Sequence, residues 1–147
     1  MKRSLYYFVF LFVVGLLQQS LQAVAPIVDY SVFYTNEEQA YVETYLLIPG
    51  SSVVFAGLPQ QLQAKVAVTV LFKQGDTIVQ FDKYQLNSKV VSDINAVNFN
   101  LIDLKRYPLP EGNYQLSLAF VDLNKPEKTA EYTTEIFIEK VVPNVVY

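Results

Sequence analysis

The amino-acid sequence predicts an all-β domain built as a sandwich of antiparallel strands. The composition is 52% apolar, with 11 Tyr, 10 Phe and recurrent Val, residue types that suit a pleated, half-buried surface. Apolar and polar residues alternate with a period of two over several stretches, and no helical period persists. Residues that favour turns separate these stretches, so the pattern indicates short strands rather than helices.

Residues 1–23 have the form of a secretory signal peptide. Lys2 and Arg3 give a short positive start, residues 4–17 are apolar, and polar residues then lead to Ala23. This order predicts cleavage after Ala23. Cleavage after Ala25 has the better Ala-x-Ala form, but Pro26 would follow that cut. An uncleaved membrane anchor is the other alternative, although the apolar run of about 14 residues is shorter than the roughly 20 that a span requires.

The first half of the mature chain predicts strands at residues 29–34, 41–48, 53–55, 65–72 and 77–86. The strand at 41–48 places Val42, Thr44, Leu46 and Ile48 on one face and Tyr41, Glu43, Tyr45 and Leu47 on the other. Gly75 gives the last two strands a hairpin turn. The apolar residues of 77–86 change face midway, which predicts a bulge near Asp82 or Lys83.

The second half predicts an inward row at Val97, Phe99 and Leu101, then strands at residues 114–121 and 132–139. A turn rich in Pro and Gly at residues 107–113 separates the row from the next strand. Residues 141–147 read as a tail or truncated linker. The predicted organisation is therefore a signal peptide (1–23), a sandwich domain (24–140) and a tail (141–147).

One local pattern narrows the type of sandwich. Gly112 and Tyr114 follow a Pro-containing corner and open the penultimate predicted strand. This is the placement of the tyrosine corner in immunoglobulin-like sandwiches, where the hydroxyl binds backbone a few residues upstream. The pattern favours an immunoglobulin-like fold of seven or eight strands, with Tyr114 and Gly112 as a structural corner.

Three segments resemble the leading β-sandwich domain of uncharacterised exported Bacteroidota proteins, relatives of the GWxTD-domain proteins. They are YVETYLLIPGSSVVF (41–55), QAKVAVTVLFKQGDTIVQFDKY (63–84) and RYPLPEGNYQLSLAFVD (106–122). The resemblance implies a β-sandwich at the head of a longer exported protein and transfers no catalytic residue. This chain has no Trp, so the Gly-Trp-x-Thr-Asp signature itself is absent.

The composition excludes several kinds of chemistry. The chain has no Cys and no His, which excludes Cys nucleophiles, Ser–His–Asp triads, and zinc, haem or iron–sulfur sites that use those ligands. The formal net charge is −3, and loss of Lys2 and Arg3 with the leader would bring it to −5. An acidic domain repels phosphate backbones, so nucleic acid is not an expected partner. We expect no enzyme activity, no cofactor and no metal.

Tyr41, Tyr45 and Phe137 are the candidate interaction residues, because all three are expected on outward faces of strands. They could contact a protein partner or a neighbouring domain, or stack on sugar rings. Two polar groups have alternative interpretations. Glu37, Glu38 and Glu43 are either a carboxylate cluster or solvated side chains, and Asp122, Asn124 and Glu127 are either calcium ligands or ordinary turn residues.

The sequence therefore predicts a non-enzymatic interaction or structural module of an exported bacterial envelope protein, located in the periplasm or at the cell surface. Its partner would be a protein or an adjacent domain, with no stable membrane span after signal cleavage. A carbohydrate-binding module is the alternative function.

Overall fold

The computed structural model describes residues 23–35 and 39–139, and these residues form an all-β fold. Nine antiparallel strands and two short 3₁₀ turns occur in them, with no α-helix. The strands are β1 (Ile27–Tyr34), β2 (Ala40–Pro49), β3 (Ala56–Leu58), β4 (Gln61–Gln63), β5 (Lys65–Gln74), β6 (Thr77–Asn87), β7 (Asn100–Pro108), β8 (Gly112–Asp122) and β9 (Thr129–Ile138). The 3₁₀ turns are η1 (Gly50–Ser52) and η2 (Ile94–Ala96). The all-β class predicted from the sequence is confirmed.

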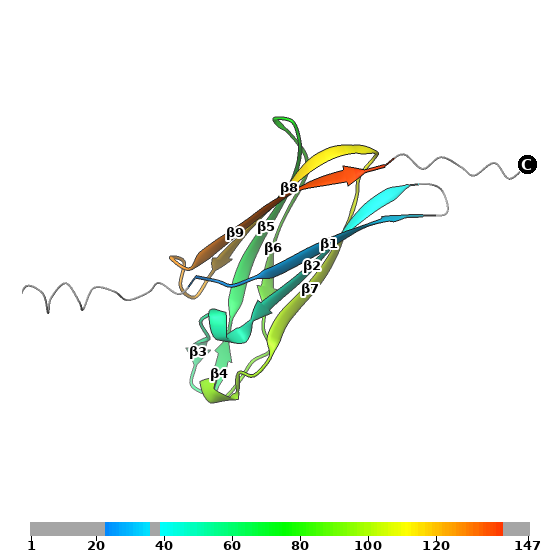
Figure 1. Cartoon of the computed structure of the whole chain (residues 1–147). Helices are drawn as coiled ribbons and strands as arrows, with labels where there is room; N and C mark the ends of the chain where they lie inside the picture. Colours follow the sequence, from blue (N-terminus) through cyan, green and yellow to red (C-terminus); the bar gives the residue numbers. More distant parts are fainter. Residues whose placement is uncertain (1–22, 36–38, 140–147) are drawn as a thin grey trace, which may run out of the picture.

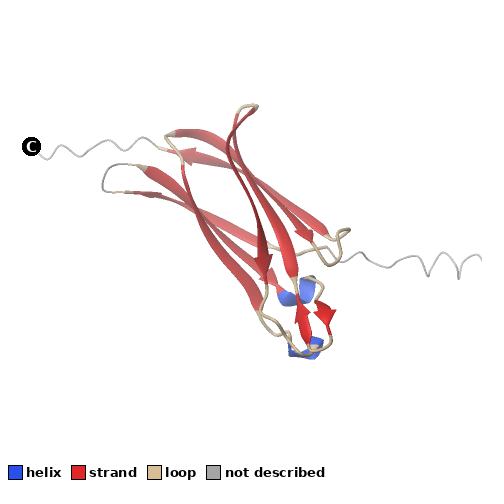
Figure 2. Ribbon diagram, turned by 180° about the vertical axis from the view of Figure 1, so that it is seen from behind, coloured by secondary structure: helices blue, strands red, loops and turns tan. Residues whose placement is uncertain are grey.

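The strands form two larger sheets and one small hairpin (Figures 1 and 2). One sheet has the order β1-β2-β7 and the other the order β6-β5-β8-β9, while β3 pairs with β4. The hairpin accounts for the difference from the seven or eight strands expected, because β3 and β4 are only three residues long. Such short elements carry too few residues to show a period of two in the sequence.

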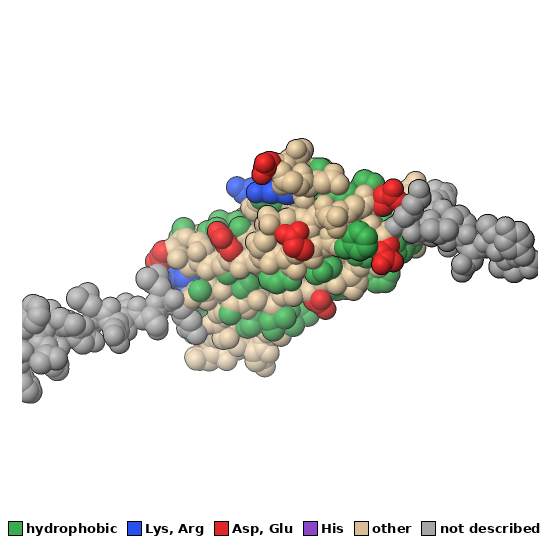
Figure 3. All heavy atoms as spheres, turned by 45° about the horizontal axis from the view of Figure 1, so that its top comes forward, with side chains coloured by type: hydrophobic (Ala, Val, Ile, Leu, Met, Phe, Trp, Pro, Cys, Tyr) green, Lys and Arg blue, Asp and Glu red, His purple; other side chains and the backbone are tan. Residues whose placement is uncertain are grey.

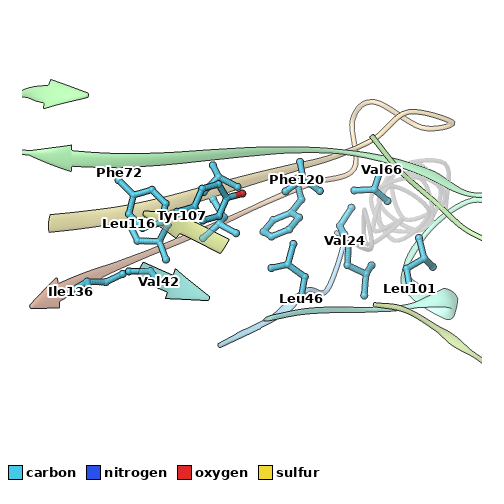
Figure 4. Close-up of a cluster of buried hydrophobic side chains, with 14 of the residues drawn as sticks. Val24, Val42, Leu46, Val66, Phe72, Leu101, Tyr107, Leu116, Phe120 and Ile136 are labelled. Carbon is cyan, nitrogen blue, oxygen red and sulfur yellow. The ribbon is translucent and has the colours of Figure 1, made fainter. Parts of the chain in front are cut away.

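Side chains from the two larger sheets meet in one hydrophobic core, shown in Figure 4. The predicted alternation is confirmed on β5 and β8, where every second residue is buried: Val66, Val68, Val70, Phe72, Tyr114, Leu116, Leu118 and Phe120. The rings of Phe72 and Tyr107 lie 5.1 Å apart and join β5 to β7 across the core. Truncating Phe72 to Ala would cost about 3–5 kcal/mol because it would leave a cavity in this packing.

The β5–β6 hairpin contains a bulge, as predicted, but the bulge is not at Asp82 or Lys83. Asp82 and Lys83 pair in regular register with Val70 and Thr69. The register shifts at the end of β5, where Phe72 pairs with Gln80 while Lys73 pairs with Ile78. Val79 is therefore the extra residue, beside the Gly75 turn. From Gln80 onward β6 alternates regularly, so the change of face in the apolar pattern arises because Phe81 is an exposed, outward residue, whereas Tyr84 and Leu86 pack against the core.

The strand predicted at residues 53–55 is wrong. Val53 and Phe55 are buried, but this segment follows η1 and does not join a sheet. The backbone N–H of Val54 donates to the Asp122 carboxylate at 2.7 Å, so a side chain takes the place of a neighbouring strand. In the sequence, a buried apolar segment has the same pattern as a strand, even when side chains rather than a neighbouring strand accept the hydrogen bonds of its backbone.

The strand around Leu101 begins and ends later than predicted. Val97 and Phe99 pack against the core before β7 begins at Asn100, and β7 continues to Pro108. Tyr107, which was placed in a turn, is a buried residue of β7 and lies opposite Val42 on β2. Pairing with β2 supplies the hydrogen bonds that keep this segment extended beyond its apolar row.

Tyrosine side chains join the edges of the two larger sheets at two seams. At the first seam, the hydroxyls of Tyr30 and Tyr34 on β1 donate to backbone carbonyls in or beside β9, at 3.1 and 3.2 Å. Their acceptors, Glu135 and Glu139, lie four residues apart, as the two tyrosines do, so β1 and β9 run in the same direction. The start of β1 and the end of β9 therefore lie at opposite ends of the described domain (Figure 1).

The second seam joins β6 to β7. The hydroxyl of Tyr84 donates to Asp103 at 2.6 Å, and the hydroxyl of Tyr107 donates to Asp82 at 3.1 Å. Lys105 lies 3.5 Å from the Asp82 carboxylate and 4.3 Å from the centre of the Tyr84 ring. This seam is thus a network of charged and polar groups rather than a pair of separate hydrogen bonds.

Candidate functional site

The outward surface of the β1-β2-β7 sheet is the leading candidate for a site. Because directly paired residues share a face, the register of β2 with its two neighbours defines four rows across this sheet. The rows are Ile27, Leu47 and Ile102; Asp29, Tyr45 and Leu104; Ser31, Glu43 and Arg106; and Phe33, Tyr41 and Pro108. We call these twelve residues the three-stranded outer face.

This face exposes large apolar side chains that do not enter the core. Ile102 is 71% exposed, and Ile27, Leu104 and Phe33 are also exposed. Eight of its twelve positions carry apolar or aromatic residues, counting Tyr and Pro. Single exposed apolar residues are ordinary on soluble proteins, but exposed apolar residues on the two strands that flank β2 make this face the leading candidate for an interaction surface.

Tyr41 lies in an aromatic and cationic stack at one end of the face. Its ring stacks on Phe33 of β1 with the ring centres 5.6 Å apart and the planes inclined by 22°. The guanidinium of Arg106 on β7 lies 5.9 Å from the same ring. Since β1 and β7 flank β2 on opposite sides, Phe33 and Arg106 contact Tyr41 from its two sides.

Glu43 lies in the middle of this face but is only 6% exposed. Arg106 donates through Nε to its carboxylate at 2.6 Å, and the Tyr45 hydroxyl donates to its other oxygen. The Tyr45 hydrogen bond, followed by that from Arg106, lowers the pKa of the Glu43 carboxyl. The same contact raises the pKa of the Tyr45 hydroxyl. The Glu43 carboxylate is therefore ionised, and its two hydrogen bonds orient Arg106 and Tyr45.

Arg106 also borders a shallow hollow at the β1–β2 end of the sheet. The hollow is about 340 Å³ in volume, and Thr35, Gln39, Ala40, Tyr41, Arg106 and Pro108 line it. The Arg106 side chain is 66% exposed, so its guanidinium is open to solvent on the side away from Glu43. The hollow is open, and it extends the outer face rather than forming an enclosed binding pocket.

The structure brings together two of the three predicted interaction residues. Tyr41 and Tyr45 lie on the three-stranded outer face, each partly exposed. Phe137 lies on β9, on the outward surface of the other larger sheet, and is 62% exposed. The three aromatics therefore do not form one stripe. Of the carboxylates considered with Glu43, Glu37 and Glu38 lie outside the described residues.

Sequence reasoning missed Phe33, Leu104 and Arg106 as members of this surface. A signal existed for Ile102, because it follows the inward row of Val97, Phe99 and Leu101 on the alternate side of the chain. Nothing in the sequence states which residue of β7 lies beside Glu43, since that depends on the register of strands far apart in the chain. The contact between Glu43 and Arg106 therefore required the structure.

The corner residues Tyr114 and Gly112 have a structural role. The Tyr114 hydroxyl donates to the backbone carbonyl of Pro110, four residues upstream, at 2.9 Å. Burial of the ring raises the pKa of this hydroxyl. Gly112 has φ = +146°, and a Cβ there would lie 2.9 Å from the Gln74 amide. A side chain at position 112 would thus strain the backbone and crowd the corner.

The turn considered as a calcium site is a structural clamp. Asp122 is fully buried and accepts from the backbone N–H groups of Val54 and Asn124 at 2.7 and 2.9 Å. The Asn124 amide donates to the carbonyls of Val54 and Gln63 at 2.8 and 2.7 Å. These side chains therefore hold the segment after η1 against the β8–β9 turn, and Asn124 acts as a donor rather than as a metal ligand.

Charged groups are dispersed elsewhere on the described surface. Figure 3 shows acidic side chains spaced apart on the face it presents, some of them beside Lys or Arg side chains. In residues 23–35 and 39–139, no group of three or more potential metal-ligating side chains comes together. Within the same ranges, no helix has the length and apolar character to cross a membrane.

The fold and this surface define an all-β protein of antiparallel sheets whose leading candidate site is an exposed sheet face. No family model, curated protein or solved structure matches the chain.

Proposed function

We propose that this chain is a non-enzymatic interaction module of an exported bacterial envelope protein and that it binds a protein partner or an adjacent domain. The observation that carries the proposal is the three-stranded outer face, where Ile102, Leu104 and Phe33 are exposed on the same face as the solvent-accessible Arg106. Aromatic residues and Arg are enriched at the centres of protein interfaces, where they contribute most of the binding energy.

We further propose that the fold is an immunoglobulin-like sandwich. The sheet β1-β2-β7 corresponds to strands A, B and E of that fold. The sheet β6-β5-β8-β9 corresponds to strands C′, C, F and G. The Tyr114 hydrogen bond at the start of the F-like strand supports this assignment. Because modules of this kind place their termini at opposite ends, they suit proteins with several domains in series, as the resemblance to leading domains of exported proteins implies.

Export is part of the proposal, with the mature chain beginning at Val24. This residue is 3% exposed and belongs to the hydrophobic core. Cleavage after Ala25 would remove a core side chain, whereas cleavage after Ala23 would retain it. N-terminal sequencing of the secreted protein tests this point, and a chain that starts at Pro26 or retains Met1 would contradict it.

A sugar-binding role receives less support from the geometry. Stacking on a sugar needs an accessible aromatic face, but Phe33 and Arg106 already contact the ring of Tyr41. An acid–base role for Glu43 is also disfavoured, because Arg106 and Tyr45 already bind its two carboxylate oxygens.

A capture experiment with matched surface variants tests the interaction role. The purified chain is immobilised and exposed to envelope extract of the source organism, beside an Ile102→Asp/Leu104→Asp variant. Phe81→Asp is the control, because Phe81 is also an exposed apolar residue but lies on the outward surface of the other larger sheet. We expect the wild type and the control to retain the same protein, and the double variant to lose it.

The proposal fails if nothing is retained above background, or if the double variant binds as well as the wild type. A glycan array provides the competing result. Specific glycan binding that is abolished by Tyr41→Ala or Phe137→Ala would replace the proposed function with a carbohydrate-binding one.

A further inference from the structure

We infer that the three-stranded outer face pairs with the same face of a second copy of this chain. The inference rests on the proposed function and names the partner. It comes from the positions of the charged residues on a face that is otherwise mainly apolar. Self-pairing of one surface produces a closed, two-fold symmetric dimer, in which each contact occurs twice.

The charges on this face are few and unevenly matched. Glu43 is already paired with Arg106, while Asp29 is exposed and forms no ion pair with any described Lys or Arg. Among the described residues, its Oδ1 atom accepts only the backbone N–H of Tyr30, at 2.8 Å. Arg106 uses Nε for Glu43, so its terminal N–H groups can bind a second carboxylate. One copy thus presents both an unpaired carboxylate and a guanidinium able to receive it.

Within one copy these two groups are separated, because Asp29 lies on β1 and Arg106 on β7, with β2 between them. Their rows are adjacent: Asp29 is in register with Tyr45, and Arg106 with Glu43. Neighbouring rows on one face are about 7 Å apart, since each comprises two residues of strand.

In the proposed dimer the two outer faces lie against each other, and the two-fold axis runs between them, parallel to the strands. This arrangement brings Asp29 of one copy close to Arg106 of the other. Such an axis places β1 of one copy over β7 of the other and leaves each row facing its own counterpart. Asp29 then lies over β7 of the second copy, about one row, or 7 Å, from Arg106. An Arg side chain can reach across one row. The two Asp29–Arg106 contacts form together, one on each side of the axis.

The apolar rows match under the same operation. At one end, Ile27 faces Ile102 of the second copy, and Leu47 faces its own equivalent. At the other end, Phe33 faces Pro108. The exposed apolar residues of both ends are thereby covered, which supplies the hydrophobic contribution that the charge pairs alone would lack.

The size of the face sets the strength expected. Three strands about 4.8 Å apart and four rows about 7 Å apart give a footprint of roughly 400 Å² per copy. Stable interfaces bury about 800 Å² per partner, so this dimer belongs to the small, transient class. We therefore expect self-association that is weaker than in a stable dimer.

Charge-swap variants test the pairing by sedimentation velocity on the purified mature chain from 10 µM to 1 mM. Asp29→Lys and Arg106→Glu each place like charges at both contacts of their own dimer, so each variant alone should associate at least tenfold more weakly. An equimolar mixture should recover association to within about threefold of wild type, because the mixed dimer has two opposite-charge pairs. Phe81→Asp, on the other larger sheet, should leave association unchanged.

Three outcomes would overturn the inference: a wild-type chain that is monomeric at 1 mM, association that neither charge variant alters, or a mixture without recovery. Should Arg106→Glu fail to fold because of Glu43, Arg106→Gln replaces it and should still weaken association at least threefold. If the wild type stays monomeric while envelope capture still depends on Ile102 and Leu104, only the identity of the partner is wrong. If capture also fails, the proposed function is wrong too.

Discussion

The two seams between the larger sheets use the same side chain with different acceptors. At the β1–β9 seam, Tyr30 and Tyr34 donate to neutral backbone carbonyls in exposed surroundings. At the β6–β7 seam, Tyr84 and Tyr107 donate to the carboxylates of two aspartates in partly buried surroundings. A hydrogen bond to a charged group in a partly buried site is worth more than one between neutral groups exposed to water.

The pKa values of both tyrosines at the β6–β7 seam are raised. Burial, then the hydrogen bond to Asp103, raises the pKa of Tyr84 well above its ordinary value near 10. Burial, then the charge of Asp82, raises the pKa of Tyr107 in the same direction. The comparison indicates that the β6–β7 seam contributes more stability than the β1–β9 seam, and that ionisation of Tyr84 and Tyr107 is opposed in the folded chain.

The largest effect is expected from Tyr84→Phe. The ring remains, but Asp103 loses its 2.6 Å hydrogen bond, so the free energy of unfolding should fall by about 2 kcal/mol. Urea unfolding at pH 7 measures the change. A loss below about 0.5 kcal/mol would show that water replaces the hydroxyl, and the difference between the seams would then disappear.

The next effect concerns alkaline stability. Well below pH 10, Tyr84 and Tyr107 are protonated in both the folded and the unfolded chain, so their raised pKa values have no effect on stability there. Above pH 10 the unfolded tyrosines ionise while Tyr84 and Tyr107 stay protonated, and stability falls by about 1 kcal/mol per pH unit for each. Urea midpoints from pH 8 to 11 should fall less steeply in Tyr84→Phe/Tyr107→Phe. Equal slopes in the two proteins would refute this account.

A smaller effect is expected from Lys105→Met, which removes the ion pair with Asp82 and the contact with the Tyr84 ring. Since Lys105 is partly exposed, the loss should be about 0.5–1 kcal/mol and should shrink in 1 M salt. Lys83→Met is the matched control. Lys83 is exposed, lies on β6, one of the two strands that meet at this seam, and forms no ion pair with a described residue. Equal losses of stability in both variants would show that the effect comes from the change in net charge and not from the contacts at the seam.

The smallest effect is expected from Tyr30→Phe, at about 0.5 kcal/mol or less. The hydroxyl bond is exposed and its acceptor, the Glu135 carbonyl, becomes accessible to water once the hydroxyl is removed. The same urea measurement checks this value. A loss larger than that of Tyr84→Phe would reverse the ranking of the two seams and show that β1 is held mainly by β9.

Sequence reasoning predicted much of the fold, because alternation is a local property. The buried faces of β5 and β8 were read correctly, since one strand is enough to show which positions alternate. The prediction failed where the partner of the backbone was not a strand, as in the segment at 53–55 held by Asp122. It also misplaced the bulge, because the extra residue Val79 shows only when Gln80 and Ile78 are paired with β5.

Sequence reasoning predicted only part of the candidate site. Alternation along β2 placed Tyr41 and Tyr45 on an outward face, and both lie there. The residues that complete the surface, Phe33 and Arg106, come from strands whose register no local pattern reveals. Phe137 was grouped with the tyrosines because it too points outward, but it belongs to a different sheet.

By itself, the sequence determined the all-β class and which sides of β5 and β8 are buried, because both follow from side-chain chemistry repeated every two residues. Only the tertiary structure decided which surfaces are formed and how the seams close. Glu43 meets Arg106, and Tyr84 meets Asp103, through strand registers and sheet edges that join distant segments. Such contacts depend on the packing of the whole chain, so neither residue of a pair carries a local signal of its partner.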